Sequence, residues 1–405
     1  MLALLAALVA AAFRLPRLDV PHEEVFDEVY HAKAALSYLR GEVPVEWVHP
    51  PTSKILISFF VWIFGYNSWS WRLAPALAGI LLAPVFLLLA RRVLATERAA
   101  ILATVLLLCD GVYLVQSRTA MTNIFAVLFQ LAAALFFVRA VLPERLPVRD
   151  TLLAGVSLGL ALSTRWTSLF AVGFFGLLVL ATRRERLVRP RELSLMLLAF
   201  AVIPAALYAG SYWFYPAIRP TGLRHLVDTQ KAIWSYHATL TATHSYFSHW
   251  YTWPWLYRPT WYFFRQANET VWGIVAIGNP ALWWASVPVT LWAIATGLRS
   301  RDPRRLFAGF GFCCLYVPWG FSPRTLNFNH YLFEALPYAC LSLGVLLDQT
   351  WDGRFRVVAR AYLGCVVALF LFFLPILTCY PLPSKLFYFP LRDGSFLWMW
   401  FRTWV

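Results

Sequence analysis

Long apolar runs separated by charged residues dominate the chain. A membrane-spanning helix needs about 20 mostly apolar residues, and eleven runs approach or reach that length. They lie near residues 1–13, 72–90, 99–116, 119–138, 151–164, 166–182, 193–213, 273–297, 306–320, 328–347 and 359–378. No repeat or polar domain interrupts them, so the pattern predicts an all-α polytopic membrane protein that forms one domain over residues 1–405.

The basic residues predict how these spans are oriented. With a cytoplasmic N-terminus, the short inner loops are 91–98, 139–150, 183–192, 298–305 and 348–360, and they hold 18 of the 35 Lys and Arg residues. Basic residues accumulate in short cytoplasmic loops. We therefore expect a multi-pass protein of the cell membrane, with outer segments at 14–71, 214–272 and 380–405.

Residues 55–71 form a further apolar and aromatic run, which ends in Trp and Asn. A twelfth span here would reverse every later loop and place the arginine clusters outside. We therefore expect an interfacial helix along the outer leaflet, where Trp side chains settle.

Composition agrees with a membrane protein and excludes other classes. The residues are 60% hydrophobic and 14% charged, whereas roughly a quarter of a soluble protein is charged. The net charge of +15 is largely explained by the inner loops, so we expect no nucleic-acid partner. The six cysteines lack CxxC or Cys/His ligand spacing, and no GxxxxGK[ST] or GxGxxG motif occurs in a credible context. We therefore expect no cofactor, no metal site formed by these cysteines and no nucleotide-driven chemistry, while the sequence leaves a requirement for a divalent metal open.

The first outer segment contains an adjacent acid pair, Asp27 and Glu28. Residues 14–54 carry seven acids against five bases, which inverts the overall sign of the chain. Neighbouring carboxylates beside a hydrophobic surface can differ in pKa, so that one acts as a base while the other positions a ligand. A solvated acidic loop is the alternative interpretation.

Isolated basic residues form a second group of candidates. His49 and Lys54 lie at either end of HPPTSK, where two prolines fix the backbone before the interfacial helix. Single arginines also lie at the outer ends of spans, where the charge rule does not explain them. A guanidinium fits a pair of phosphate oxygens, although anchoring at the interface is an equal alternative. These arginines are Arg72, Arg118, Arg165 and Arg324, and His330 lies close to the last of them.

The outer segment 214–272 combines histidines with many aromatic residues. His244 and Trp253 are its candidates for contacts with an acceptor or a sugar. Aromatic rings with polar tips line sugar and peptide sites, but they also form interfacial belts, and the sequence leaves both readings open. The histidine spacing matches no zinc-ligand set.

The chain resembles the protein O-mannosyltransferase family, also called dolichyl-phosphate-mannose–protein mannosyltransferases, in its short bacterial form without a MIR domain. The resemblance covers about residues 20–347 and rests on the order of FDEVYHAK, HPPTSK, WRLAPALAG, DGVYLVQSRTAMTNIF, GLALSTRWTSL, THSYFSHWYTWPWLYRPTWYFF, IGNPALWW and VPWGFSPRTLNFNHYLFEALP. It implies a GT-C glycosyltransferase fold of eleven spans, with Asp27 as general base and Glu28 orienting acceptor or donor. It also implies roles in donor-phosphate or substrate binding for His49, Lys54, Arg72, Arg118, Arg324 and His330.

The resemblance further implies an inverting transfer of mannose from a polyprenyl-phosphate-mannose donor to Ser or Thr hydroxyls of secreted polypeptides. Membrane lipids and the secretion translocon would be partners at an extracytoplasmic active site. Two alternatives stay open. One is a GT-C transferase that moves a lipid-linked sugar to a glycolipid or envelope glycan. The other is a lipid-sugar flippase, which is less favoured because the spans lack polar midplane residues.

The chain departs from the family pattern at three positions. Ser53 stands where HPPxGK has Gly, Asn123 stands where an Asp follows the SR dipeptide, and Arg165 replaces the Lys of TKW. Asn123 is expected to remove a carboxylate from the neighbourhood of Arg118. Because Asp27 and Glu28 are intact, we still expect activity.

Overall fold

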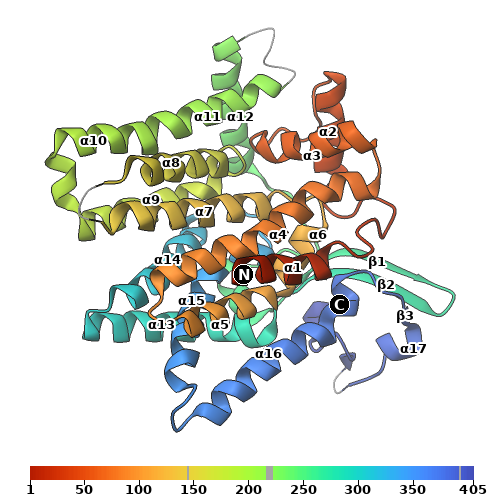
Figure 1. Ribbon diagram of the computed structural model, residues 1–405. Helices are drawn as coiled ribbons and strands as arrows, with labels where there is room; N and C mark the ends of the chain where they lie inside the picture. Colours follow the sequence, from red (N-terminus) through yellow and green to blue (C-terminus); the bar gives the residue numbers. More distant parts are fainter. Residues whose placement is uncertain (144–145, 216–221, 392–393) are drawn as a thin grey trace.

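The computed structural model describes residues 1–143, 146–215, 222–391 and 394–405. Most of the described residues are helical, and the long helices lie side by side in one bundle (Figure 1). The α-helices are α1 (Leu2–Arg14), α2 (Glu28–Arg40), α3 (Thr52–Phe64), α4 (Ser68–Val93), α5 (Glu97–Leu108), α6 (Gly111–Arg118), α7 (Asn123–Val141), α8 (Val148–Leu162), α9 (Leu169–Thr182), α10 (Pro190–Leu197), α11 (Ile203–Ser211), α12 (Gly222–Thr239), α13 (Pro280–Ser300), α14 (Pro303–Tyr316), α15 (Leu336–Thr350), α16 (Arg356–Leu377) and α17 (Ser384–Phe387).

Several helices confirm the predicted multi-span character. Among the described residues, five helical segments are long and apolar enough to cross a membrane, or six if a bent pair counts as one span. The five are Ser68–Val93, Asn123–Val141, Pro190–Phe214, Pro280–Ser300 and Arg356–Leu377. The other predicted spans correspond to shorter or interrupted helices, so the count of eleven stays a prediction.

The predicted span at 99–116 is broken, because Asp110 separates α5 from α6 at a bend of 60°. The Asp110 carboxylate accepts hydrogen bonds from the backbone N–H of Tyr113 at 2.8 Å and of Asn279 at 3.1 Å. It also accepts from the indole N–H of Trp283 at 2.7 Å. Asp110 therefore caps α6 and ties this bend to the start of α13.

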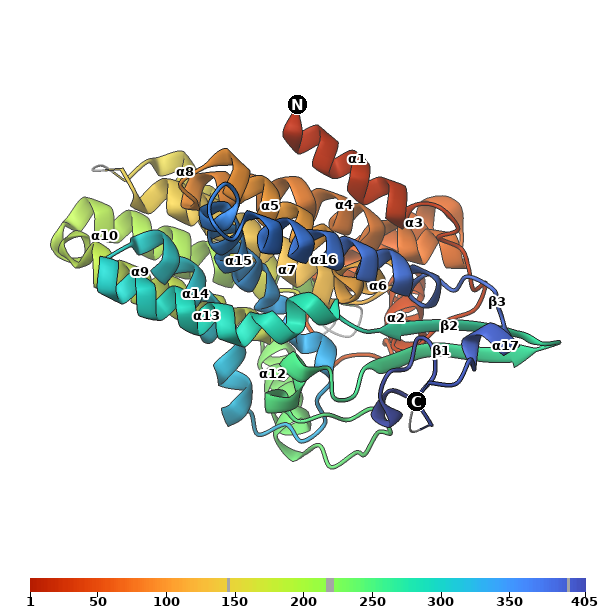
Figure 2. The same cartoon turned by 90° about the horizontal axis from the view of Figure 1, so that it is seen from below.

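A three-stranded antiparallel sheet corrects the expectation of an all-α fold. Strands β1 (Thr260–Ala267) and β2 (Thr270–Ala276) form a hairpin, and β3 (Leu382–Pro383) pairs with β2. Figure 2 shows this hairpin projecting from one end of the helical bundle. The span predicted at 273–297 consequently begins too early, since residues 273–276 belong to β2 and α13 begins at Pro280. β-branched and aromatic residues dominate both strands, which favours extended backbone.

The helix predicted at 55–71 is also shorter than expected. Gly65 has a φ of +75° and ends α3 after Phe64. The Asn67 side chain accepts the N–H of Ser70 and the Ser70 hydroxyl accepts the N–H of Asn67, so a capping box starts α4. α3 exposes large apolar side chains, with Trp62 71% exposed, and its place at the membrane interface stays a prediction.

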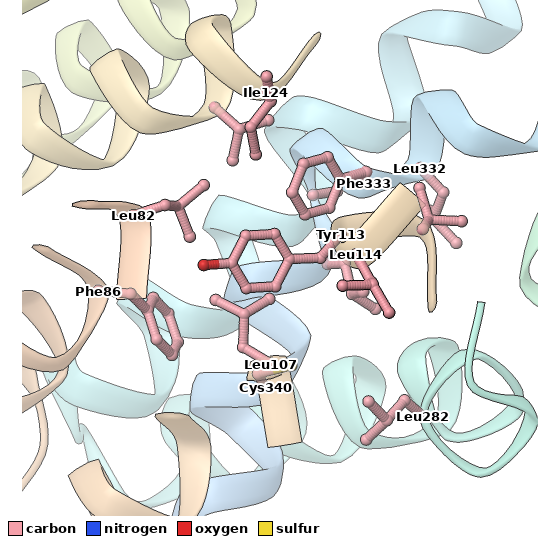
Figure 3. Packing of buried hydrophobic residues seen from close by; sticks show 14 of the residues in the cluster. Leu82, Phe86, Leu107, Tyr113, Leu114, Ile124, Leu282, Leu332, Phe333 and Cys340 are labelled. Atoms are coloured by element: carbon pink, nitrogen blue, oxygen red, sulfur yellow. The ribbon is translucent and has the colours of Figure 1, made fainter. Parts of the chain in front are cut away.

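The buried core centres on Tyr113 of α6. Figure 3 shows its ring among Leu82 and Phe86 from α4, Leu107 from α5 and Phe333 from a 3₁₀ turn at Asn329–Glu334. The Tyr113 and Phe333 rings stack with centroids 5.7 Å apart. This packing holds the segments that follow α6 and precede α15, and both of these segments line the cavity described next.

Candidate active site

A cavity of about 530 Å³ opens beside Asp27. Its walls come from the start of α2, the loop before α3, the segments preceding α7 and α9, the end of α12 and the segment before α15. The candidate residues from the sequence that line it are Asp27, His49, Arg165, His244, Arg324 and His330. The fold therefore brings together candidates that are far apart in the sequence.

Phe26 gives Asp27 its position. Its φ of +47° is a left-handed conformation, which costs a bulky L-residue roughly 1–2 kcal/mol. The Phe26 ring stacks on Tyr262 at 4.3 Å and makes edge contacts with Phe328 at 5.6 Å and His330 at 6.1 Å. These aromatic contacts hold the strained turn, and Asp27 follows it directly at the cavity and at the start of α2.

The Asp27 carboxyl has the electrostatics of a base. Burial raises its pKa above the ordinary aspartate value, while His31, Arg324 and Arg165 partly offset that effect. A carboxylate that is costly to keep ionised binds a proton more strongly, which favours acceptance of a proton from a hydroxyl group.

Glu28 faces away from the cavity, although it is the next residue. Its carboxylate is fully buried, and the Arg72 guanidinium donates to both oxygens at 2.8 and 2.7 Å. The backbone N–H groups of Val25 and Ala120 donate to the same carboxylate at 3.0 and 2.8 Å. The two adjacent acids therefore have different surroundings, because one lines the cavity and the other joins α2 to α4.

Arg72 and Arg118 do not line the cavity. Arg72 also donates to the carbonyl oxygens of Leu18, Pro21 and Glu23. Arg118 donates to the carbonyl oxygens of Phe13, Arg14, Pro16 and Arg17. Both guanidinium groups thus hold the end of α1 and the segment that leads to Asp27, and their predicted role in donor binding stays a prediction.

Lys54 is buried behind the cavity wall and contacts the Glu46 carboxylate. Glu46 also accepts the His49 Nδ1–H at 2.8 Å and the His49 backbone N–H at 3.0 Å. Burial opposes ionisation of Glu46, but Lys54 and His49 outweigh it and hold the pKa of that carboxyl well below its usual range. Burial lowers the pKa of His49 to about 3, although the Glu46 charge raises it in part, so this imidazole is neutral near pH 7.

Arg324 lines the cavity, and a hydrogen bond with His237 of α12 holds its guanidinium. The His237 Nε2 lies 3.0 Å from the Val48 carbonyl oxygen and therefore carries the proton. Its Nδ1 then accepts from the Arg324 guanidinium at 3.1 Å. Burial and the nearby Arg324 charge lower the pKa of His237 to about 4, which keeps the accepting tautomer neutral.

Arg165 also lines the cavity, on a wall that Glu334 supports. Its Nε lies 3.6 Å from the buried Glu334 carboxylate, and its Nη1 donates to the Asn123 side-chain oxygen. The guanidinium lies 5.2 Å from the Tyr331 ring centre, within reach of a cation–π interaction. Asn123 therefore contacts Arg165, which corrects the expectation that it lies beside Arg118.

His244 and Trp253 have different places. His244 lines the cavity, and burial lowers its pKa with a partial offset from Asp27. Trp253 is buried away from the cavity, and its indole N–H donates to Ser248. In the described ranges, the His, Cys, Asp and Glu side chains form no group of three that could hold a metal ion.

Sequence reasoning missed His31, Glu46 and the supporting contact from His237. His31 follows Asp27 by four residues at the start of a helix, and Glu46 precedes His49 by three. Those short spacings could have indicated both residues. His237 offered no comparable signal, because its contact with Arg324 joins segments that are distant in the sequence.

Family comparisons match nearly the whole chain. A family model described as dolichyl-phosphate-mannose-protein mannosyltransferase matches residues 4–219, and one described as the C-terminal four TMM region of protein-O-mannosyltransferase matches residues 222–404. The chain is 27% identical to a polyprenol-phosphate-mannose–protein mannosyltransferase of Mycolicibacterium smegmatis and 29% identical to one of Mycobacterium tuberculosis. These matches cover 94% of this chain and 90% and 88% of the two relatives.

Solved structures show the same architecture. The Saccharomyces cerevisiae protein O-mannosyltransferase Pmt1–Pmt2 complex bound to the sugar donor matches with a TM-score of 0.81 and 15% identity, over 97% of this chain and 92% of that one. ArnT from Cupriavidus metallidurans bound to undecaprenyl phosphate matches with a TM-score of 0.62 and 19% identity, over 94% and 74%. At these identities the likeness concerns the fold alone, and it confirms the predicted GT-C architecture.

Proposed function

Because the chain belongs to the dolichyl-phosphate-mannose-protein mannosyltransferase family, we propose that it transfers mannose from a polyprenyl-phosphate-mannose lipid to Ser or Thr hydroxyls of secreted polypeptides. The names of the two mycobacterial relatives support this donor and a protein acceptor. The cavity supplies the supporting chemistry, because the Asp27 carboxylate shares it with the guanidinium groups of Arg165 and Arg324.

Asp27 acts as the general base in this proposal. It takes the hydroxyl proton as the acceptor oxygen attacks C1 of mannose from the face opposite the phosphate, so the anomeric configuration inverts. A phosphate leaves without protonation, and a second carboxylate acting as general acid is therefore unnecessary, in contrast to glycoside hydrolysis. The site fits a mechanism with a single carboxylate, because Asp27 lines the cavity and Glu28 is buried against Arg72.

Arg165 and Arg324 stabilise the charge that develops on the departing phosphate, with His330 beside them. Cationic groups fixed before the reaction stabilise such charge without reorganisation. Arg165 is fixed by Glu334 and Asn123, and Arg324 is fixed by His237. We assign the phosphate to this pair in place of Arg72 and Arg118, whose donors are engaged by Glu28 and by backbone carbonyls.

The active site faces the extracytoplasmic side of the cell membrane in this proposal, with the N-terminus in the cytoplasm. The cavity is lined largely by residues from the outer segments 14–71 and 214–272 and by the outer ends of spans. The positively charged inner loops support this orientation. The lipid tail of the donor lies between helices, and acceptors arrive as they leave the secretion translocon.

A reconstituted transfer assay tests the function. The purified protein is incubated with radiolabelled polyprenyl-phosphate-mannose and a Ser- and Thr-rich peptide, with the Asp27→Asn variant as the matched control. We expect label on the peptide that alkaline β-elimination releases, and only with the unmodified protein. Label recovered in a second lipid or a glycan, or no transfer, would contradict a protein acceptor.

A further inference from the structure

We propose that His31 takes the proton from Asp27 after each transfer and holds it as an imidazolium opposite the Glu46 carboxylate. The proposal rests on the proposed function, because the proton concerned is the one that the acceptor hydroxyl loses. It adds a proton-accepting residue for the catalytic base to that function.

A proton can pass between Asp27 and His31 through one water, without direct contact of the two side chains. The His31 backbone N–H donates to the Asp27 carbonyl oxygen at 3.0 Å, so the two residues are one helical turn apart. Residues four apart lie on the same face of a helix, and both side chains line the same cavity. The largest charge effect on the Asp27 carboxyl also comes from His31.

The His31 ring has an unfilled hydrogen-bonding position. The side chain is 3% exposed, and its Nδ1 has no hydrogen-bond partner among the described residues. A buried polar atom without a partner destabilises the folded state. The Glu46 Oε2 lies only 3.8 Å from this nitrogen. The tautomer that carries its proton on Nδ1 therefore directs an N–H at a carboxylate that is already in place, and it leaves Nε2 free to accept the proton from Asp27.

Glu46 is suited to hold the imidazolium without taking its proton. Lys54 from α3 and His49 from the same loop contact its carboxylate and keep it ionised. The His31 and His49 rings lie 5.9 Å apart, and the neutral His49 does not repel an imidazolium. Arg165 and Arg324 also line this cavity, and their positive charges oppose protonation of His31.

The proton balance needs no additional reactant. The acceptor O–H bond and the donor C1–O bond break, a new C1–O bond forms, and the electron pair of the broken donor bond leaves with the phosphate. The hydroxyl proton passes to Asp27 and then to His31, which restores the Asp27 carboxylate. The departing phosphate monoester, with a second pKa of about 6, removes the proton from the cavity.

The pH dependence of the His31→Gln variant tests this relay. We expect kcat to fall about 100-fold at pH 7, as for other positioned proton-transfer groups, with the KM for donor within twofold. The loss should shrink as pH rises, because hydroxide then takes the proton from Asp27. His22→Gln is the matched control, since His22 is exposed and its Nδ1 lies 3.5 Å from Asp19, and it should retain kcat within twofold.

Added imidazole gives a second, independent readout. We expect it to restore the rate of His31→Ala but not that of Asp27→Asn. An unchanged kcat in His31→Gln, or a loss that neither pH nor imidazole relieves, would overturn the relay and leave His31 a packing role. Absence of transfer by the unmodified chain would instead refute the proposed function, so the two failures are distinguishable.

Discussion

Arg72 donates hydrogen bonds to both carboxylate oxygens of Glu28, a residue 44 positions earlier in the sequence, and neither side chain is more than 1% exposed. Removing one partner of a buried ion pair leaves an uncompensated charge, which costs about 3–5 kcal/mol. This contact fixes how the segment before Asp27 packs against α4, so it gives Glu28 a structural role.

Glu28→Gln is accordingly expected to lower the unfolding free energy by about 3–5 kcal/mol and to lose activity through misplacement of Asp27. Thermal denaturation of the purified protein measures the effect, with Asp19→Asn on the exposed side of the same segment as control. An inactive Glu28→Gln variant with an unchanged Tm would instead assign Glu28 to the chemistry.

Asp27→Asn should separate activity from stability. Transfer is expected to fall by about 10²–10⁴-fold, the usual contribution of a general base. Burial raises the pKa of Asp27 in the folded protein, so ionisation at neutral pH opposes folding, and a neutral amide removes that opposition. The Tm should therefore stay the same or rise, and a clear decrease would contradict the described surroundings of Asp27.

The pH profile of the unmodified enzyme should have an acidic limb set by Asp27. The group must be ionised to accept a proton, so kcat/KM falls as pH drops through its folded pKa. Because burial raises that pKa, the midpoint is expected above the ordinary aspartate value of about 3.9. Initial rates across the pH range measure it, and a flat profile down to pH 4 would exclude Asp27 as the titrating base.

Arg165→Gln and Arg324→Gln should each reduce kcat by about 10²–10³-fold, because fixed donors to a developing anion contribute that much. Arg265→Gln is the matched control, since Arg265 is exposed and pairs with Glu23 at 2.6 Å. The control should remain within twofold. Full activity in either cavity variant would remove that arginine from the phosphate site.

Gly155 of α8 tests the helix packing. A Cβ atom at this position would lie 2.0 Å from the Ala199 carbonyl oxygen, whereas one at Gly173 of α9 would meet nothing within 4 Å. We expect Gly155→Ala to lower the Tm by several degrees and Gly173→Ala to leave it nearly unchanged. Equal Tm values would contradict the close approach of α8 to the π-helical segment Leu198–Val202, which lies between α10 and α11.

The fold could be predicted where hydrophobicity alone decides structure. The apolar run at 72–90 lies within α4, and the run at 359–378 lies in α16 except for its last residue. The break at Asp110 could not be predicted, because its hydrogen-bond partners Asn279 and Trp283 lie in a distant segment. Strands β1 and β2 could not be predicted either. Their aromatic residues are typical of interfacial segments as well as of strands.

The sequence likewise indicated some residues of the candidate site but not others. Asp27, His49, Arg324 and His330 carry local signals, and the cavity brings them together. Residue type could not separate Arg118 from Arg165, because each is an arginine at the end of a predicted span. The difference arises from their partners, which are backbone carbonyls for Arg118 and the Glu334 and Asn123 side chains for Arg165.

The turn at Phe26 also has a consequence for biosynthesis. Phe26 lies near the N-terminus and leaves the ribosome early, but its ring rests on Tyr262, Phe328 and His330, which are translated much later. A nascent chain thus contains Asp27 early, but it still lacks the three rings that pack against the preceding Phe26. The turn at Phe26 can therefore reach its final packing only after residue 330 has been translated.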